Sequence, residues 1–482
     1  MRPVAVGGPL AIAALLTLVA CGGDGSGSPP PPPATIRTLA YVISECRGND
    51  SGFFERYALV VREGDRDPVT VAEVPETGPA VLFNGRYCRT LGLIRFGDNS
   101  PRRGSFTRLG VSPDGSTVVF EETDAFSIAF HNFLTPEQRG IFVVHADGTA
   151  LRRLGPPSRE SPFTPTGGFY FTNFAFSPDG RTITFPDRGP SPAGDDATQI
   201  FTLDLATGTR RQVTRLPLTP PSGVLPAAYS PTFVDNETIT FFSLANPDGL
   251  NPQGIPSAFR VNVDGSHLTI LPSTVVSLGA QIVPIFAITG ARPEALTLFV
   301  RGIPSGPPVS DPPLKIIAEI FVFDGTNLLQ LTNFGRADTG EGPSLVGADG
   351  QHVFFSASAD PLGTNPSENC QLFSIDRLGV ELRQLTRFNA SERSDIGCDF
   401  NSDTHGCALG LRAQDATTQT LLLASGCDPF GTNPTGEQIF AVASDGSGLR
   451  QLTTLRGLFT DLDGSVHAEL PGPMAYGPGS LP

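Results

Sequence analysis

Tryptophan is absent from this 482-residue chain, and methionine (2), tyrosine (6) and histidine (6) are scarce. The Gly-x-Ser-x-Gly pentapeptide that presents the nucleophile of α/β-hydrolases is also missing, which argues against a serine hydrolase. No two cysteines form a Cys-x-x-Cys pair, so a structural zinc site is not expected. After residue 20, no segment has the length and apolarity of a membrane-spanning helix.

Positively charged residues are fewer than negatively charged ones. The chain has 33 Lys and Arg against 48 Asp and Glu, a formal net charge of −15. Such a surface should repel nucleic acid and anionic lipid, so neither is expected as a partner. A membrane can then be reached only through a lipid anchor.

The N-terminus provides such an anchor. Arg2 is followed by an apolar stretch over residues 10–20, and Leu18-Val19-Ala20-Cys21 resembles the lipobox of bacterial lipoproteins. The resemblance implies a signal peptide over residues 1–20 and lipid on Cys21, with several acyl chains giving stable anchoring. Gly22 in place of Asp favours sorting to the outer membrane. The expected location is the cell envelope, at the periplasmic face of the outer membrane or the cell surface; an ordinary secretory signal is the alternative.

Residues 21–35 then read as a linker. Its first half is rich in Gly and Ser and should be flexible. Its second half contains five consecutive prolines and should be stiff. It would hold a folded body over residues 36–482 away from the lipid surface.

Six cysteines remain after Cys21, and an even number outside the cytoplasm indicates disulfides. The candidates are Cys46, Cys88, Cys370, Cys398, Cys407 and Cys427. The sequence cannot choose among the connectivities. We favour Cys46–Cys88, Cys398–Cys407 and Cys370–Cys427, because each pair then stays within one repeat or in neighbouring repeats.

A repeat dominates the remainder of the chain. A short apolar strand enters an Asp-Gly-type turn, and a second strand follows that ends near Leu-Thr. The six copies cover 141–154, 200–214, 259–271, 320–332, 372–386 and 439–453. Repeats of this length indicate stacked supersecondary units.

A second hairpin precedes each copy. It is clearest at 109–120 and 174–185, where Ser-Pro-Asp-Gly forms the turn, and degenerate at 229–242 and 345–355. Each unit is therefore predicted to hold four strands. The fold class is all-β, a single β-propeller with seven blades, six or eight being possible. The piece 465–476 should complete the first blade and close the ring.

The combined pattern resembles the TolB-type, WD-like β-propeller repeat of bacterial envelope proteins, over roughly residues 37–476. The resemblance implies a non-catalytic propeller that binds other proteins, and it implies structural roles for the motif residues. The chain differs from TolB in lacking the small α/β domain before the propeller and in carrying its own lipid anchor.

The long loops between the second and third strands are the candidate binding face. Two of them match closely, at 360–366 and 428–434. Their candidate residues are Asp360, Thr364, Asn365, Asp428, Thr432 and Asn433. They could form ordered turns over neighbouring blades or line a binding surface. For these six residues we favour the structural role, and for the face as a whole we favour the binding role.

No catalytic or metal-binding constellation stands out. The histidines are His131, His145, His267, His352, His405 and His467, and none pairs with another at metal-ligand spacing. The acidic residues Asp461, Asp463, Asp195 and Asp196 do not complete an EF-hand pattern. We therefore expect no metal, no cofactor and no catalytic residue; calcium bound by these acidic residues is the alternative.

The hypothesis is a lipid-anchored, non-catalytic propeller that binds an envelope protein or a peptidoglycan component. The alternative is a propeller enzyme acting on a glycan, lactone or other small molecule in the central channel.

Overall fold

The computed structural model describes much of the chain after residue 36. The described residues are 37–49, 52–74, 105–123, 137, 139–159, 174–217, 228–252, 257–270, 277–278, 281–282, 285–289, 297–304, 316–323, 328–334, 341–347, 349–366, 369–388, 409–415, 418–432, 438–460, 466–477 and 479–480. The predicted signal peptide, Cys21 and the linker lie outside this set. Within it, no helix is long and apolar enough to cross a membrane.

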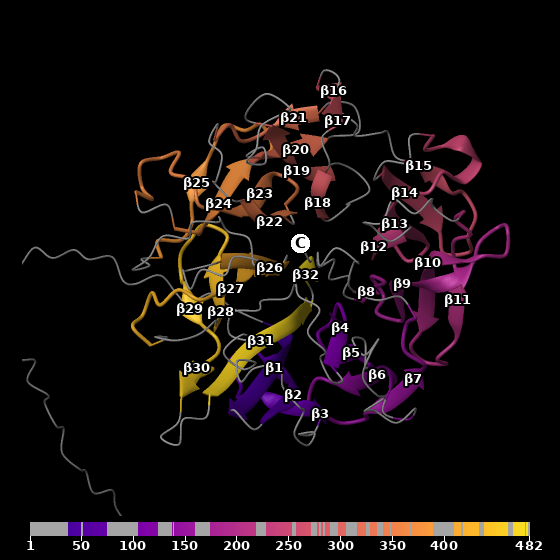
Figure 1. Ribbon diagram of the computed structural model, residues 1–482, viewed down its shortest axis with the longest axis horizontal. Helices are drawn as coiled ribbons and strands as arrows, with labels where there is room; N and C mark the ends of the chain where they lie inside the picture. Colours follow the sequence, from indigo (N-terminus) through magenta and orange to yellow (C-terminus); the bar gives the residue numbers. More distant parts are fainter. Residues whose placement is uncertain are drawn as a thin grey trace, which may run out of the picture. The chain divides into compact units, whose positions relative to one another are not determined.

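The first sheet joins the two ends of the folded chain (Figure 1). In spatial order it contains β3 (Val69–Val74), β2 (Gly52–Glu63), β1 (Thr38–Asn49), β31 (Val466–Gly477) and β30 (Gly457–Thr460). The antiparallel register between β1 and β31 runs from Thr38↔Gly477 to Gly48↔Val466. The prediction that the C-terminal strand completes the first blade is thus confirmed, and β1 has no open edge on that side.

The second, third and fourth sheets follow in chain order. Their strands are β4 (Ser105–Val111), β5 (Thr117–Thr123), β6 (Gly140–His145) and β7 (Arg152–Gly155); β8 (Ala175–Phe176), β9 (Thr182–Pro190), β10 (Asp196–Asp204) and β11 (Arg210–Gln212); and β12 (Ala228–Phe233), β13 (Thr238–Ser243), β14 (Ser257–Asn262) and β15 (Thr269–Ile270). A 3-10 turn, η1 (Pro247–Gly249), lies between β13 and β14.

The fifth, sixth and seventh sheets complete the series. They contain β18 (Ile285–Thr289), β19 (Thr297–Pro304), β20 (Ile316–Phe323) and β21 (Leu328–Gln330); β22 (Glu341–Val346), β23 (His352–Ala357), β24 (Gln371–Asp376) and β25 (Arg383–Gln384); and β26 (Leu409–Asp415), β27 (Thr420–Ser425), β28 (Gln438–Ala443) and β29 (Arg450–Gln451), with β32 (Gly479–Ser480) on β26. A separate hairpin pairs β16 (Ser277–Leu278) with β17 (Gln281–Ile282).

Hydrophobic cores lie between sheets that are consecutive in the chain. One member from each side illustrates the six described cores: Leu59 with Phe120, Ile141 with Phe185, Ile200 with Phe259, Val322 with Phe355, Leu372 with Phe440, and Ile439 with Leu39. The last of these joins the seventh sheet to the first. Sheets stacked face to face in sequence order, with the last against the first, make this all-β chain a β-propeller.

Phenylalanine pairs hold the second and third strands of several sheets together. Phe120 and Phe142 are directly opposite in the register, and their rings stack at 5.3 Å. Phe241 and Phe259 stack at 5.6 Å, and Phe355 and Phe373 at 5.7 Å. Because stacked aromatic pairs add stability beyond their buried area, this position explains the repeated phenylalanine of both hairpins.

The predicted Ser-Pro-Asp-Gly turns form in the two clean copies. The Ser112 hydroxyl donates to Asp114, whose carboxylate also accepts the Ser116 N–H, and Gly115 adopts a φ of +76°. Ser177 and Asp179 repeat the first contact. These bonds inside the turn stabilise the backbone that the strand reversal requires.

The degenerate hairpin predicted over 229–242 forms, but its turn does not lie at Ser230-Pro231. These residues lie inside β12, where the register with β13 shifts between Tyr229 and Thr232 and Ser230 has a φ of +49°. The turn comes later, at Asp235, which accepts the Glu237 N–H. A β-bulge thus occupies the place where the motif predicted the turn.

The threonine that ends four of the six repeats belongs to a buried clamp. In the seventh sheet, the Thr453 hydroxyl accepts the Ile439 N–H at 2.9 Å and donates to the Gln438 side chain at 2.7 Å. Gln438 also accepts the Leu455 N–H. The equivalent pairs are Gln199–Thr214, Glu319–Thr332 and Gln371–Thr386. Each clamp ties the end of the fourth strand to the start of the third.

The glycine of the outer turn allows neighbouring sheets to approach closely. A Cβ on Gly446 would lie 2.9 Å from the carbonyl oxygen of Leu385 in the preceding sheet. Gly208 has the same relation to Leu154, and Gly265 to Val213. Since all three also adopt positive φ, two independent constraints favour glycine.

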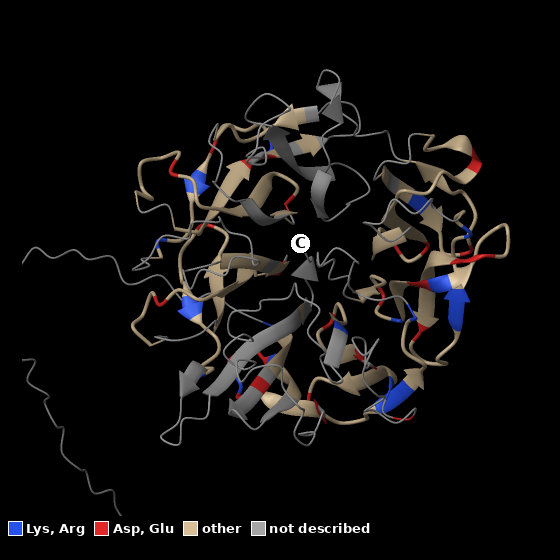
Figure 2. Cartoon of the chain, in the orientation of Figure 1, with Lys and Arg blue, Asp and Glu red and all other residues tan. Residues whose placement is uncertain are grey.

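Arginines lie on the short outer strands, where Figure 2 marks them in blue, and three of them bond to the next sheet. The Arg152 guanidinium donates to the Leu205 carbonyl and Arg211 to the Asp264 carbonyl. Arg450, in the seventh sheet, pairs with Asp65 of the first. Arg152, Arg211 and Arg450 therefore connect neighbouring sheets, whereas Arg383 of the sixth sheet pairs with Glu381 of its own repeat.

Candidate binding surface

The loops and the Asp-Gly turns lie at opposite edges of each sheet. In an antiparallel meander the connection between the second and third strands faces away from the other two turns. The outer turn also contacts the inner turn of the same sheet, as shown by bonds from Ala146 N to Ser116 O and from Leu205 N to Arg181 O. We call these two sides the turn edge and the loop edge.

The loop of the sixth sheet is built around Asn365. This side chain is 2% exposed and donates to the carbonyls of Ala359 (3.1 Å) and Asn369 (2.8 Å). The Asp360 carboxylate accepts the Asn365 N–H at 2.7 Å. Asp360 and Asn365 therefore hold the loop in one conformation. Of the two interpretations, this agrees with the one in which these residues form an ordered turn.

The loop of the seventh sheet repeats this construction. Asp428 accepts the Thr432 N–H at 2.7 Å. The Thr432 hydroxyl donates to Gln451 on β29, as the Thr364 hydroxyl donates to Gln384 on β25. Asn433 lies outside the described residues. The two threonines thus attach their loops to the fourth strand of the same sheet.

A third copy of this loop escaped the sequence reasoning. In the fourth sheet, Asn251 is 3% exposed, its N–H donates to the Asn246 side chain at 2.7 Å, and its amide donates to the Ala245 carbonyl. The shared spacing is Asx-Pro-x-Gly-x-Asn-Pro, which 246–252 also satisfies. A search for that spacing, rather than for close identity, would have found it.

The loops display apolar side chains at their tips. Leu362 is 44% exposed and Phe430 is 48% exposed, at equivalent positions of the sixth and seventh sheets. In the third copy the tip position is occupied by Asp248, and Leu250, which is 37% exposed, stands where the other two loops have threonine. The polar candidate residues form hydrogen bonds inside the loops. The exposed side chains are those of the tip residues, which the sequence did not point to.

A buried disulfide region lies beside the two matching loops. Cys370 and Cys427 are both disulfide-bonded, and their exposed fractions are 0% and 2%. They belong to the same core cluster between the sixth and seventh sheets, as the predicted pair Cys370–Cys427 requires. The side chains of Cys46, Cys88, Cys398 and Cys407 lie outside the described residues.

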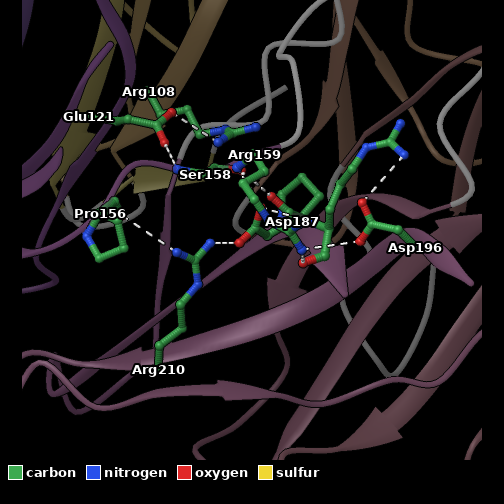
Figure 3. A network of polar contacts seen from close by, with 10 residues as sticks. Arg108, Glu121, Pro156, Ser158, Arg159, Asp187, Asp196 and Arg210 are labelled. Carbon is green, nitrogen blue, oxygen red and sulfur yellow. Dashed lines mark hydrogen bonds and ion pairs between the residues drawn. The ribbon is translucent and has the colours of Figure 1, made fainter. Parts of the chain in front are cut away.

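A second polar centre joins the second and third sheets (Figure 3). Arg108 and Glu121 form an ion pair at 2.9 Å, with each side chain 1% exposed. Glu121 also accepts the Ser158 N–H. Asp187 accepts the Ser158 hydroxyl and the Arg159 N–H, and it pairs with Arg210.

Arg210 is the most perturbed cation of this centre. Its guanidinium lies 4.9 Å from the Phe185 ring centre and 5.2 Å from that of Phe201. Burial lowers the pKa of Arg210 to about 10, while the Glu121 charge opposes the decrease. Arg210 thus stays charged at neutral pH. The contacts of Ser158 and Arg159 with Asp187 join the second sheet to the third.

The described histidines lie at the turn edge. His145 contacts the Thr149 hydroxyl, His267 contacts Ser266, and His352 contacts Asp349. The side chains of His131, His405 and His467 are outside the described set. Among the residues that the structure does describe, no three His, Cys, Asp or Glu side chains are grouped as metal ligands.

No family model matches the chain, and no curated protein matches it. Several solved structures are similar to the chain. A prolyl endopeptidase is 10% identical with a TM-score of 0.46, covering 89% of this chain but 54% of its own. The manganese complex of an oligogalacturonate lyase is 12% identical with a TM-score of 0.40, over 93% of this chain and 98% of its own. The β-propeller domain of the trilobed protease from Pyrococcus furiosus is 12% identical with a TM-score of 0.39, over 74% and 90%.

Proposed function

We propose that this chain is a lipid-anchored, non-catalytic β-propeller of the bacterial envelope that binds a protein or a cell-wall component through its loop edge. The observation that carries the proposal is the pair of matching loops on neighbouring sheets. Their polar residues are used internally, and their tips offer Leu362 and Phe430 to solvent. A pre-organised loop loses little entropy on binding, which favours recognition.

The envelope location is proposed from the sequence and from the cysteines. The lipobox at Cys21 and the linker after it favour an anchored protein. Disulfide-bonded Cys370 and Cys427 fit an oxidising compartment. We also propose that the seven sheets of four or five strands are seven blades, and that the repeats are of the TolB type.

In-cell crosslinking of the anchored protein tests the binding role. The matched variant replaces residues 361–364 and 429–432 with Gly/Ser turns of the same length. We expect the native chain to capture one dominant adduct that the variant loses, with unchanged thermal unfolding. Capture that is identical in both would remove the loop edge as the binding surface.

The anchor is tested separately, by Cys21→Ser and membrane fractionation. The native chain should sediment with the envelope membranes and the variant should be released in soluble form. A variant that stays membrane-bound would contradict lipidation at Cys21.

A further inference from the structure

The chain enters the propeller at the turn edge, between the first and second sheets. The Thr38 hydroxyl donates to the Gly115 carbonyl at 2.8 Å, and the Gly64 N–H donates to the Arg37 carbonyl at 2.6 Å. Gly115 lies in the inner turn of the second sheet, and Gly64 follows β2 of the first sheet. The segment that precedes Arg37 therefore leaves the propeller at the junction of these two sheets.

Two large apolar side chains are exposed at this junction. Val69, on β3, is 43% exposed, and Leu151, just before β7, is 53% exposed. The outer turn before Leu151 lies against β3, since a Cβ built on Gly148 would be 3.6 Å from the Val69 side chain. Val69 is directly opposite Val61 of β2, which is buried in the core shared with the second sheet, so both side chains point to that face. The apolar face of the first sheet therefore continues from its core to the surface.

Leu151 differs from its counterparts in three other repeats. Leu268, Leu382 and Leu449 occupy the same position and are partly buried against their cores. Leu151 instead lies half exposed at the junction with the first sheet. Because exposed apolar surface gains free energy when it is covered, Val69 and Leu151 together are suited to dock an apolar segment.

A segment of suitable chemistry leaves the propeller at the same place. Residues 25–36 contain no charged side chain, and residues 29–36 read Pro-Pro-Pro-Pro-Pro-Ala-Thr-Ile. Val69 lies two strand spacings from β1, about 10 Å. Eight residues in polyproline II conformation reach about 25 Å, so the linker can cover this distance. A tethered segment has a high effective concentration, and a polyproline segment loses little entropy when it docks.

We propose that residues 29–36 dock on Val69 and Leu151, so that the proline-rich half of the linker is part of the propeller surface rather than a free spacer. Residues 22–28, which are rich in Gly and Ser, then form the tether. Because the docked segment lies at the turn edge, the loop edge faces away from the N-terminal anchor. This consequence, unlike the docking itself, rests on the proposed function.

Tryptophan fluorescence tests the docking without background, because the chain has no tryptophan of its own. The full chain carries Ala34→Trp, in the proline-rich half, or Ser26→Trp, in the Gly/Ser half. The patch variant adds Val69→Ser with Leu151→Ser, and the matched control adds Leu378→Ser, a 64% exposed leucine at the turn edge of the sixth sheet. Thermal unfolding of each variant establishes that it is folded.

We expect acrylamide to quench the tryptophan at position 34 less than the tryptophan at position 26. Shielding by an attached lipid would give the opposite order, because position 26 is closer to Cys21. The patch variant should lower the ratio of docked to undocked linker about tenfold and remove the difference between the two positions. Leu378→Ser should leave the difference unchanged.

Replacement of residues 29–33 by Gly and Ser should also remove the protection of position 34. Equal quenching at both positions without the patch substitutions, or protection that survives them, would overturn the inference. Protection that rises with protein concentration would overturn it too, since the linker would then dock on a second copy. Each of these results leaves the binding role of the loop edge untouched, because crosslinking measures that role separately.

Discussion

At the scale of single residues, the repeats are explained by hydrogen bonds that a sequence pattern does not display. Thr453 recurs because its hydroxyl joins two strands through Gln438, and Asn365 because its amide spans a loop. Both side chains are almost fully buried. A buried polar group with all its partners stabilises one conformation, and without them it is costly.

Thr453→Val tests the clamp. The substitution keeps the shape but removes the hydroxyl, so the Ile439 N–H loses its acceptor and Gln438 loses a donor. We expect a loss of about 1–3 kcal/mol in the free energy of unfolding. The neighbouring exposed Thr454→Val is the control and should change little. Urea denaturation curves measure both; equal curves would contradict the role of the clamp.

Arg108→Leu tests the buried ion pair between β4 and β5. It leaves the Glu121 carboxylate buried without its cation, which should cost about 3–5 kcal/mol. The double variant Arg108→Leu/Glu121→Gln should recover much of this loss, because an amide oxygen can still accept the Ser158 N–H without a charge. Thermal unfolding compares the two variants. A double variant less stable than the single one would show that the charge itself is required.

At the scale of the element, each hairpin turn performs two tasks. It reverses the chain, and its outer copy fits against the carbonyl of the preceding sheet, as Gly446 fits against Leu385. The Asp-Gly signal predicted the reversal correctly. The contact between sheets could not be predicted from one hairpin, because it depends on where the neighbour lies.

Gly446→Ala separates these two tasks. Its φ of +87° alone should cost about 1–2 kcal/mol, and the Leu385 carbonyl at 2.9 Å from the new Cβ should add to this. Gly350→Ala is the matched control, since its φ is +64° and its Cβ would meet nothing within 4 Å. We expect Gly446→Ala to lower the melting temperature more than Gly350→Ala does. Equal decreases would mean that the close approach between sheets is unimportant.

At the scale of the whole molecule, stability depends on the closure of the series of sheets. Cores join consecutive sheets, and the seventh sheet packs on the first through Ile439 and Leu39. The hydrogen-bonded pairing of β1 with β31 places both ends of the folded chain in this closing sheet.

Deletion of residues 466–482 removes β31 and should abolish a single cooperative unfolding transition. It exposes the backbone of β1, so aggregation is also expected. Deletion of residues 478–482 alone removes only the short β32 and is the control, for which we expect a small change. Calorimetry reports both. A single sharp transition after the longer deletion would contradict closure by the C-terminal strand.

Acid should destabilise the folded chain through its turns. The Ser112 hydroxyl and the Ser116 N–H lower the pKa of Asp114 from the ordinary 3.8, and Ser447 does the same for Asp445. Because the folded pKa lies below the unfolded one, these carboxylates stabilise the fold above about pH 4, and the contribution is lost as the pH falls through the folded values. The melting temperature should therefore fall between about pH 5 and pH 3. A flat profile would contradict this prediction.

Local sequence patterns were sufficient to predict the strands, the turns and their order along the chain. Periodic apolar strands and Asp-Gly turns need only local information, and they predicted a propeller with its C-terminal strand in the first sheet. Ser230-Pro231 failed as a turn because a bulge in β12 is decided by pairing with β13.

The side chains that the loops expose could be identified only from the folded arrangement of the sheets. Their Asp, Thr and Asn residues look like a recognition motif in the sequence, yet they bond to the loop and to the fourth strand of their own sheet. That leaves Leu362 and Phe430 as the exposed anchors. Whether a side chain is used internally or offered to a partner depends on neighbours distant in the chain, and those neighbours exist only once the sheets are stacked.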